Sequence, residues 1–353
     1  MTLLSSSAEY VLDLDYARGH LPDFLSNGGS MLITGSTGLI GSFIVDCILR
    51  HNECEPLRII EVTCLSRSID KLKSRFGTDP VGISYLESDV CNVELDGMAF
   101  DCVLHLASNA DPNMYALYPV ETITGNVIGT YRLLDWQRRA CPAARFFLAS
   151  TMEVYGEKKD GSSFSECDYG LIDFNSIRSG YPESKRVSEL LCSSYSEEYG
   201  LETRIGRLGY IYGPTMTDLD SKVVAQFIRS ALALKPIELK SLGTQKRSYC
   251  YVADAVSAIF TLLDKGSNGE AYNISNMGSV TTIAGLADCV ASSVDMHVVS
   301  AAQTDLEKKG SSPAINAVLS HEKLSELGWS PKYSLSDGIA RTINVLASCM
   351  AGE

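Results

Sequence analysis

The stretch GSTGLIGS, residues 35–42, follows the apolar run 31–34 and opens the amphipathic segment 38–50. Its three glycines stand at intervals of three. Because glycine has no Cβ, such a backbone can approach a pyrophosphate, and the N-terminus of the following helix directs unpaired N–H groups at it. The stretch therefore predicts a dinucleotide-binding turn between a buried strand and a helix. The residues expected to contact the dinucleotide in this turn are Gly35, Thr37, Gly38, Leu39, Ile40 and Gly41.

Short apolar segments alternate with amphipathic ones along the chain that follows this turn. Such alternation is typical of βαβ units, in which helices cover both faces of a parallel sheet. Right-handed crossovers then give an α/β fold with a doubly wound (Rossmann) sheet. The predicted strands are 31–34, 59–65, 83–86, 102–107, 145–150 and 203–208, and the predicted helices are 38–50, 69–76, 119–139 and 181–199.

The regular alternation ends after the sixth predicted strand, and this change predicts three regions. Residues 1–30 form a helical extension at the N-terminus, and residues 31–208 form the dinucleotide-binding domain. Residues 209–353 form mainly a smaller α/β lobe that binds the substrate. Segments near 249–263 and 271–275 are expected to return to the first domain.

The composition, 45% hydrophobic and 21% charged residues, is that of a soluble globular protein. With a net charge of −13 and no long basic run, neither nucleic acid nor a membrane surface is an expected partner. The 11 cysteines form no C-x-x-C pair and the 5 histidines are dispersed, so no metal site is predicted. Unpaired thiols and an acidic N-terminal segment without a secretion signal predict a cytoplasmic location.

Two segments bear on which dinucleotide is bound. The second predicted strand ends in Ser66-Arg67, where an acidic residue would bond the ribose hydroxyls of NAD. A guanidinium group there can pair with a 2′-phosphate, so the sequence favours NADP and leaves NAD open. Asp89 and Val90 follow the third predicted strand, and the Asp89 carboxylate is expected to hold the adenine amino group.

A tyrosine and a lysine at the start of the last predicted helix are candidate catalytic residues. Tyr181 and Lys185 lie four residues apart and so on one helix face. A nearby ammonium group stabilises a phenolate and lowers the pKa of a tyrosine, which suits Tyr181 to act as a general base. Thr151, after strand 145–150, is expected to share a hydrogen bond with the hydroxyl group that Tyr181 deprotonates.

These motifs occur together in a recognisable order. From residue 31 to about 340 the chain resembles the extended short-chain dehydrogenases/reductases, a family of NAD(P)-dependent nucleotide-sugar epimerases, dehydratases and decarboxylases. Stretches such as 105–130 and 241–256 read most like UDP-glucuronate decarboxylases. The motifs that carry the resemblance are Gly35-x-x-Gly38-x-x-Gly41, His105-Leu-Ala-Ser108, Ser150-Thr-Met-Glu-Val-Tyr-Gly156, Tyr181-x-x-x-Lys185 and Tyr212-Gly-Pro214.

The resemblance implies the substrate and the chemistry. The substrate is a sugar joined to a nucleoside diphosphate. Tyr181 takes a proton from a sugar hydroxyl group, usually at C4, while hydride passes to the nicotinamide ring. Lys185 tunes Tyr181 and holds the nicotinamide ribose.

The resemblance also implies further binding residues and an assembly. Leu106, Ala107 and Ser108 are expected beside the cofactor, and Arg247 and Lys222 at the substrate nucleotide or its diphosphate. The protein is expected to be a homodimer, in which helices 119–139 and 181–199 pack against their symmetry mates as a four-helix bundle.

The chain departs from the dehydratases of this family directly after Thr151. Those relatives carry Asp-Glu, whereas this chain carries Met152-Glu153. Because methionine cannot donate a proton, half of the acid/base pair for elimination is missing. Glu153 stays a candidate base.

The substrate pocket departs from the family as well. Decarboxylases orient the substrate carboxylate with an arginine ahead of a proline, where this chain has Ser312, with Lys308 and Lys309 as candidate substitutes. Tyr210 stands where relatives often place an asparagine that reaches the substrate phosphates. Tyr210 and Met152 are therefore expected to line a pocket that copies no branch of the family.

Epimerisation makes the smallest demand on this set of residues. Thr151, Tyr181 and Lys185 suffice to oxidise the sugar and to return hydride to its other face. The sequence therefore predicts an epimerase first, a dehydratase using Glu153 second and a decarboxylase third, with an NADPH-dependent 4-keto-sugar reductase also open. A dinucleotide sensor without activity is the alternative from another class, but it would have no need of these three residues together.

Overall fold

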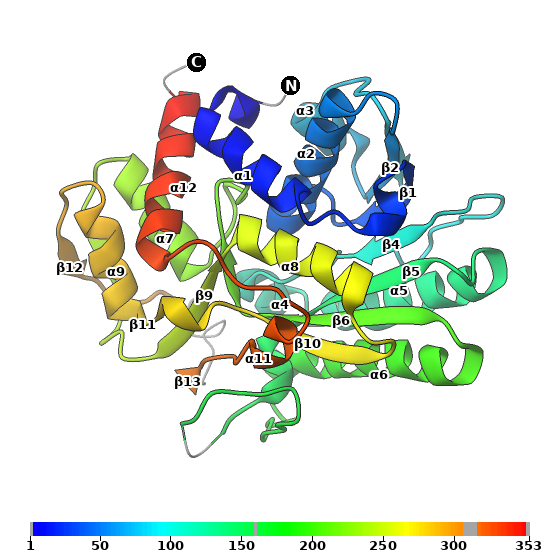
Figure 1. Cartoon of the computed structure of the whole chain (residues 1–353). Coiled ribbons are helices and arrows are strands. Elements are labelled where there is room, and N and C mark those ends of the chain that lie inside the picture. Colours follow the sequence, from blue (N-terminus) through cyan, green and yellow to red (C-terminus); the bar gives the residue numbers. More distant parts are fainter. Residues whose placement is uncertain (1–2, 159–160, 306–315, 351–353) are drawn as a thin grey trace.

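The computed structural model describes residues 3–158, 161–305 and 316–350. It confirms the predicted α/β fold, because seven parallel strands form one sheet in the order β10-β6-β5-β4-β1-β2-β3 (Figure 1). The carboxyl ends of these strands meet along one edge, where ligands bind in open α/β sheets. The strands are β1 (Gly29–Thr34), β2 (Ile60–Ser66), β3 (Ile83–Glu87), β4 (Cys102–His105), β5 (Arg145–Thr151), β6 (Glu202–Leu208) and β10 (Glu270–Ile274).

Helices cover both faces of this sheet (Figure 1). On one face lie α2 (Leu39–Cys54), α3 (Ile69–Phe76) and α8 (Val252–Lys265), and on the other α5 (Pro119–Ala140) and α6 (Gly180–Tyr199). Neighbouring strand residues point to opposite faces, so Leu32 and Ile33 of β1 enter two separate apolar cores. This double burial explains why the strands read as continuous apolar runs in the sequence.

The predicted strands and helices are confirmed with small shifts at their ends. One such shift is at β4, which ends at His105, whereas the sequence predicted a strand to residue 107. The reason is local: the N–H groups of Leu106 and Ala107 both donate to Thr34 Oγ1, at 3.1 and 3.0 Å. The chain therefore leaves the sheet ladder and turns beside the end of β1.

The N-terminal helix α1 (Ala8–Arg18) packs against α2, α8 and the C-terminal helix α12 (Leu335–Met350). Its Asp13 side chain is fully buried. That carboxylate accepts hydrogen bonds from the Tyr251 and Tyr333 hydroxyl groups, both at 2.7 Å, and pairs with Arg341 at 2.8 Å. One buried charge therefore joins the two ends of the described chain.

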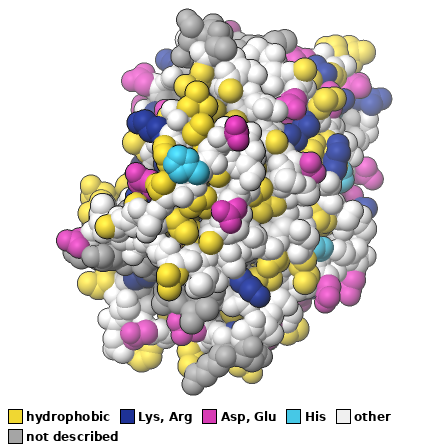
Figure 2. All heavy atoms as spheres, turned by 90° about the vertical axis from the view of Figure 1, so that its left-hand side faces the viewer, with side chains coloured by type: hydrophobic (Ala, Val, Ile, Leu, Met, Phe, Trp, Pro, Cys, Tyr) yellow, Lys and Arg dark blue, Asp and Glu magenta, His cyan; other side chains and the backbone are white. Residues whose placement is uncertain are grey.

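A smaller lobe lies beyond the carboxyl edge of the main sheet. Its strands β7, β9, β11 and β13 form a four-stranded sheet, and β8 pairs with β12. Figure 2 looks onto this side of the molecule and shows acidic and basic side chains interspersed among hydrophobic ones. The remaining strands are β7 (Tyr210–Tyr212), β8 (Ile237–Leu239), β9 (Lys246–Tyr251), β11 (Val280–Thr282), β12 (Val298–Ser300) and β13 (Asn316–Ala317), and the remaining helices include α4 (Pro112–Leu117), α7 (Val223–Leu232), α9 (Ile283–Ser292) and α11 (Glu322–Ser325). Within the described ranges, none of the helices is long and apolar enough to cross a membrane.

Replacing Asp13 tests whether the α1 contact stabilises the whole fold. We expect Asp13→Asn to lower the free energy of unfolding by about 3 kcal/mol, because it removes a buried charge partner of Arg341 and turns an amide N–H₂ towards phenol donors. Urea denaturation followed by circular dichroism measures this change. Asp15→Asn is the matched control on the same helix: its carboxylate is 32% exposed, so its loss should cost about 1 kcal/mol or less. Equal losses for the two variants would contradict the assignment.

Candidate active site

The turn between β1 and α2 is shaped by its three glycines. Gly35 has φ +70°, and a Cβ there would lie 2.8 Å from the backbone nitrogen of Ala107. A Cβ on Gly41 would overlap the carbonyl oxygen of Gly35, so the first turn of α2 packs directly on the loop. Gly38 differs, because a Cβ there would meet only the same oxygen, at 3.3 Å. The first and third glycines build the turn, and the second keeps its outer side clear.

This turn fits a dinucleotide. Gly38 is the N-cap residue of α2, so the first N–H groups of the helix, which have no partner within it, point out beside the clear side of Gly38. A pyrophosphate is the anion that such a helix end and a turn without Cβ atoms accommodate. The predicted contact residues 35–41 therefore lie together.

A second wall of the same region comes from the end of β4. Thr34 Oγ1 accepts the N–H groups of Leu106 and Ala107 and lies 2.9 Å from His105 Nδ1. Because both lone pairs of that hydroxyl oxygen are used, its proton goes to Nδ1. Burial lowers the pKa of His105 to about 3, so the ring is neutral. The Ser108 hydroxyl group donates a hydrogen bond of 2.8 Å to a side chain of α5. The predicted cofactor contacts 106–108 are thus fixed beside the glycine turn.

Arg67, the predicted contact of a 2′-phosphate, lies where expected, directly after Ser66 at the end of β2. Its guanidinium pairs with Glu121 of α5 at 2.5 Å, and the two side chains are 59% and 50% exposed. An exposed ion pair of this kind is weak. Its Glu121 carboxylate nevertheless offsets the positive charge of Arg67, which a 2′-phosphate would need as its partner.

Asp89 and Val90, predicted at the adenine, lie in the turn after β3. One oxygen of the Asp89 carboxylate accepts the N–H of Cys91 at 2.8 Å and so stabilises its own turn. Val90 is buried against Gly129 of α5, where a Cβ would come within 2.7 Å of it. The second oxygen of Asp89 is the one left for the expected amino group.

Tyr181 and Lys185 lie on the first turns of α6, and both are buried. The Lys185 ammonium group donates to the carbonyl oxygen of Ala149 at 2.8 Å, which fixes it at the end of β5. Thr151 Oγ1 accepts the N–H of Glu153 at 3.2 Å, and its hydroxyl group is hydrogen-bonded to the Tyr181 side chain. The structure thus brings Tyr181, Lys185 and Thr151 together.

The protonation of this group differs from the expectation. Burial raises the pKa of Tyr181 and the Glu153 carboxylate adds to the rise, whereas Thr151 and Arg178 oppose it. The predicted lowering of the Tyr181 pKa is therefore wrong for this environment, because desolvation outweighs the nearby positive charge. Burial also lowers the pKa of Lys185 to about 8. Tyr181 is a neutral phenol at neutral pH, and Lys185 is mainly charged.

An ion pair beside Tyr181 was missed in the sequence. Arg178 donates to both oxygens of Glu153, at 2.7 and 3.0 Å, and the two side chains are 16% and 19% exposed. Tyr115 of α4 accepts from Arg178 at 3.2 Å, and its ring stacks on that of Tyr181 with centroids 4.9 Å apart. The signal was available, since Arg178 stands three residues before Tyr181. Arg178 thus occupies one lone pair on each oxygen of Glu153 and fixes the orientation of this candidate base.

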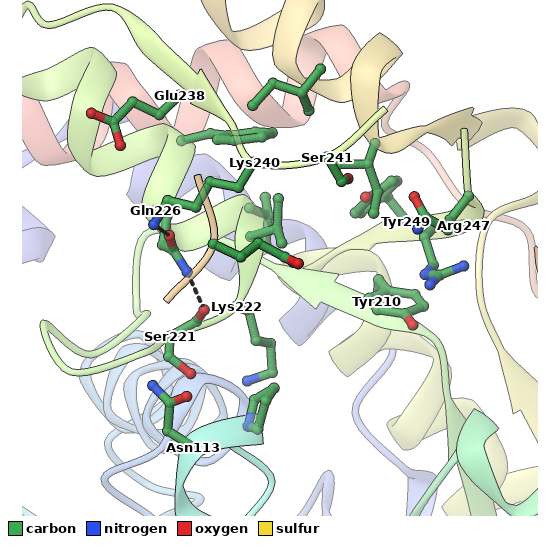
Figure 3. Close-up of a pocket in the computed structure, with 18 of the residues that line it drawn as sticks. Asn113, Tyr210, Ser221, Lys222, Gln226, Glu238, Lys240, Ser241, Arg247 and Tyr249 are labelled. Atoms are coloured by element: carbon green, nitrogen blue, oxygen red, sulfur yellow. Dashed lines mark hydrogen bonds between the residues drawn. The ribbon is translucent and has the colours of Figure 1, made fainter. Parts of the chain in front are cut away.

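A cavity of about 200 Å³ opens between this ion pair and the smaller lobe. In Figure 3, Lys222 and Asn113 lie on one side of it, and Arg247 and Tyr210 on the other. Arg247 is buried, with its guanidinium 5.2 Å from the centre of the Tyr210 ring. The ammonium group of Lys222 lies 3.3 Å from Asp220. The expected substrate contacts Arg247, Lys222 and Tyr210 thus line one cavity together with Glu153.

Met152 was also expected to line the substrate pocket, but the structure places it elsewhere. Its apolar side chain is buried in a small cluster with Phe164 and Leu319, behind Tyr210, and does not line the cavity. Lys308, Lys309 and Ser312 lie outside the described residues. Among the residues that are described, no group of three His, Cys, Asp or Glu side chains could hold a metal ion.

Comparison with known proteins places this geometry in a family. The profile of the NAD dependent epimerase/dehydratase family matches residues 31–278. UDP-glucuronic acid decarboxylase 6 of Arabidopsis thaliana is 34% identical over 319 residues, which cover 90% of this chain and 88% of the relative. UDP-glucuronic acid decarboxylase 1 of Xenopus tropicalis is 31% identical and covers 89% of this chain and 71% of the relative.

Solved structures show the same fold. The UDP-glucose 4-epimerase of Thermus thermophilus in complex with NAD has a TM-score of 0.75 and 26% identity, covering 90% of this chain and 98% of the other. DesIV, a dTDP-glucose 4,6-dehydratase of Streptomyces venezuelae with NAD bound, has a TM-score of 0.74 and 26% identity, covering 90% of this chain and 96% of the other.

The glycines of the turn allow binding and folding to be separated. We expect Gly38→Ala to fold normally and to lose at least about tenfold in NAD affinity, since its methyl group enters the space beside the helix N-terminus. Gly41→Ala should instead lower the melting temperature, because its methyl group overlaps the backbone of Gly35. Calorimetric NAD titration and thermal denaturation of both variants test this. Unchanged affinity in a folded Gly38→Ala would contradict the placement of the pyrophosphate.

Proposed function

The chain belongs to the NAD-dependent epimerase/dehydratase family, and on this premise we propose that it epimerises a nucleoside-diphosphate sugar through transient oxidation at C4. One observation carries the proposal: Tyr181, Thr151 and Lys185 are buried together at the end of β5, beside a cavity with basic residues on its far walls. The 11 cysteines, which form no C-x-x-C pair, favour the cytoplasm as the location of this reaction.

The chain's own residues supply binding and proton transfer. Arg247 and Lys222 bind the diphosphate by charge, which directs the sugar towards Tyr181. Tyr181 must first release its own proton; as the phenolate it takes the proton of the C4 hydroxyl group and later returns it, while Thr151 donates a hydrogen bond to the oxygen atoms involved. The charged Lys185 stabilises the phenolate that this exchange requires. NAD, when bound, supplies the hydride acceptor and donor at C4.

The surroundings of Glu153 favour epimerisation over elimination of water. A base takes the C5 proton with a lone pair of its own, and Arg178 occupies one lone pair on each oxygen of Glu153. Met152, which occupies the position after Thr151, cannot donate a proton to the leaving hydroxyl group and is buried away from the cavity. Rotation of a ketone sugar needs neither group.

Decarboxylation is the second candidate. The observation that favours it is the 34% identity, over 90% of this chain, to a UDP-glucuronic acid decarboxylase. A 4-keto uronate loses carbon dioxide once its carboxylate is oriented, without a base at C5. The two candidates are distinguished by whether the product keeps the mass of the substrate or has lost that of carbon dioxide.

We propose NAD, rather than NADP, as the resident cofactor. The argument for NADP was the guanidinium of Arg67, but Glu121 pairs with it and would repel a 2′-phosphate. The ribose hydroxyl groups of NAD carry no charge and meet no such repulsion.

We also propose a homodimer formed through α5 and α6. Their outward faces carry a stripe of large apolar side chains, and such a stripe marks an interaction surface when it is contiguous. The members of this α5/α6 stripe are Val120 (72% exposed), Ile123 (40%), Ile128 (40%), Tyr131 (48%), Val187 (41%) and Leu190 (66%).

A panel of UDP-, dTDP-, CDP- and GDP-sugars, incubated in D₂O with NAD and analysed by liquid chromatography and mass spectrometry, tests the reaction. We expect a product of unchanged mass and new retention time that retains the C5 hydrogen, since neither C5 deprotonation nor carbon loss occurs. Tyr181→Phe should reduce turnover at least about 1,000-fold with NAD affinity unchanged. Loss of the mass of water or of carbon dioxide would contradict epimerisation.

The α5/α6 stripe is tested by light scattering after size exclusion. We expect the wild type to have the mass of a dimer and Leu190→Glu to have that of a monomer, because a charge would be buried in an apolar interface. Leu57→Glu is the control, since Leu57 is 97% exposed and lies outside the stripe. A dimer that survives Leu190→Glu would place the interface elsewhere.

A further inference from the structure

An aspartate in the loop after β4 joins the main sheet to the smaller lobe beside the substrate cavity. Asp111 Oδ2 accepts the backbone N–H of Ser221 at 2.7 Å, and Asp111 Oδ1 accepts the Ser221 hydroxyl group at 2.8 Å. Asp111 is the N-cap residue of α4, whereas Ser221 stands two residues before the start of α7. Both oxygens of one carboxylate therefore hold a segment that lies 110 positions further along the chain.

The same carboxylate also caps α4. Asp111 Oδ1 accepts the N–H groups of Asn113 and Met114, at 2.9 and 3.4 Å. Asn113 and Ser221 both line the cavity, and Figure 3 shows them next to each other on one side of it. Asp111 thus bonds to two lining residues, one from each side of the boundary between the main sheet and the smaller lobe.

Helix α4 leads from this contact to the reacting groups. The N–H of Tyr115 donates to the carbonyl oxygen of Asp111 at 3.2 Å, so the two residues are joined by one helical turn. The Tyr115 ring stacks on that of Tyr181 with centroids 4.9 Å apart, and its hydroxyl oxygen accepts from Arg178 at 3.2 Å. The position of Asp111 is therefore fixed relative to Tyr181.

On the other side of the contact, Ser221 leads directly to Lys222. The Lys222 N–H donates to Asp220 Oδ1 at 2.9 Å, and its ammonium group lies 3.3 Å from the same carboxylate. The carbonyl oxygen of Asp220 accepts from Arg229 at 2.6 Å. The backbone at Lys222 is thus held on both sides. Its ammonium group, on a side chain that is 33% exposed, can turn from Asp220 to a diphosphate.

We propose that Asp111 is a positioning residue: through Ser221 it holds Lys222 at the distance from Tyr181 that a bound nucleoside-diphosphate sugar spans. The inference rests on the proposed function, which places the diphosphate at Lys222 and the sugar at Tyr181. The diphosphate is bound from the smaller lobe, but the sugar reacts at the edge of the main sheet. A contact that fixes the two before the ligand arrives removes an ordering cost from binding.

Calorimetric titration of the full-length, NAD-loaded protein with UDP, dTDP, CDP and GDP tests this role. We expect Asp111→Ala to lower the affinity for the tightest of the four about tenfold, because two charge-assisted hydrogen bonds no longer hold Lys222 in place. The affinity for NAD should not change, since Asp111 lies away from the glycine turn. Unchanged diphosphate affinity in a folded Asp111→Ala would overturn the proposal.

A second variant separates this role from helix capping. Asp111→Ser keeps an acceptor for the N–H of Asn113, because serine is a good N-cap residue, but its single oxygen cannot hold both donors of Ser221. We expect Asp111→Ser to lose diphosphate affinity as Asp111→Ala does. Full affinity in Asp111→Ser would reduce Asp111 to a cap of α4 and contradict the proposal. If Asp111→Ala fails to fold, Asp111→Ser decides.

A double-mutant cycle tests whether the effect passes through Lys222. In a Lys222→Ala background, Asp111→Ala should lower the diphosphate affinity less than about twofold, because the group that it positions is already absent. An equal loss in both backgrounds would show that Asp111 acts by another route, and would overturn the proposal.

Hydrogen exchange followed by mass spectrometry examines the contact itself, without any nucleotide. The Ser221 amide should exchange at least about tenfold faster in Asp111→Ala, since its hydrogen-bond acceptor is lost. An unchanged exchange rate would refute the contact. A wild type that binds a diphosphate but converts no sugar would refute the proposed reaction and leave the role of Asp111 in binding intact. A wild type that binds none of the four diphosphates would refute both.

Discussion

The burial of one ammonium group governs the architecture of this site. Removing the Lys185 charge from water costs several kcal/mol unless the protein supplies partners. The carbonyl oxygen of Ala149 is such a partner, so β5 and α6 must meet within hydrogen-bond distance. Once they do, Tyr181 and Thr151 lie beside each other. The packing of α6 on the sheet and the arrangement of the candidate catalytic residues therefore depend on the same contacts.

Much of the fold was predictable because the constraints that set it are local or periodic. Burial of a strand on two faces demands an apolar run, and Leu32 and Ile33 show why both residues must be apolar. The glycine turn was predictable because Gly35 needs a positive φ and Gly41 a close backbone contact. Helical spacing predicted that residues such as Tyr181 and Lys185 share a face.

The rest depends on contacts between distant segments, which spacing does not show. Asp13 is held by side chains more than two hundred residues away. The Arg178–Glu153 pair and the ring of Tyr115 come from three separate elements, and their meeting beside Tyr181 is not visible in the sequence. The raised pKa of Tyr181 has the same origin, since it reflects burial that only the folded chain produces. The sequence predicted that Tyr181, Lys185 and Thr151 lie together, but not what surrounds them.

In the proposed reaction the chain oxidises its sugar and then reduces it again with the same bound nicotinamide. Rapid mixing of the NAD-loaded protein with the converted nucleotide sugar, followed by the near-ultraviolet absorbance of reduced nicotinamide, tests this most directly. We expect a signal that rises and then decays within a turnover, and that is absent in Tyr181→Phe. Conversion without any such signal, or only with reduced cofactor consumed from solution, would contradict it.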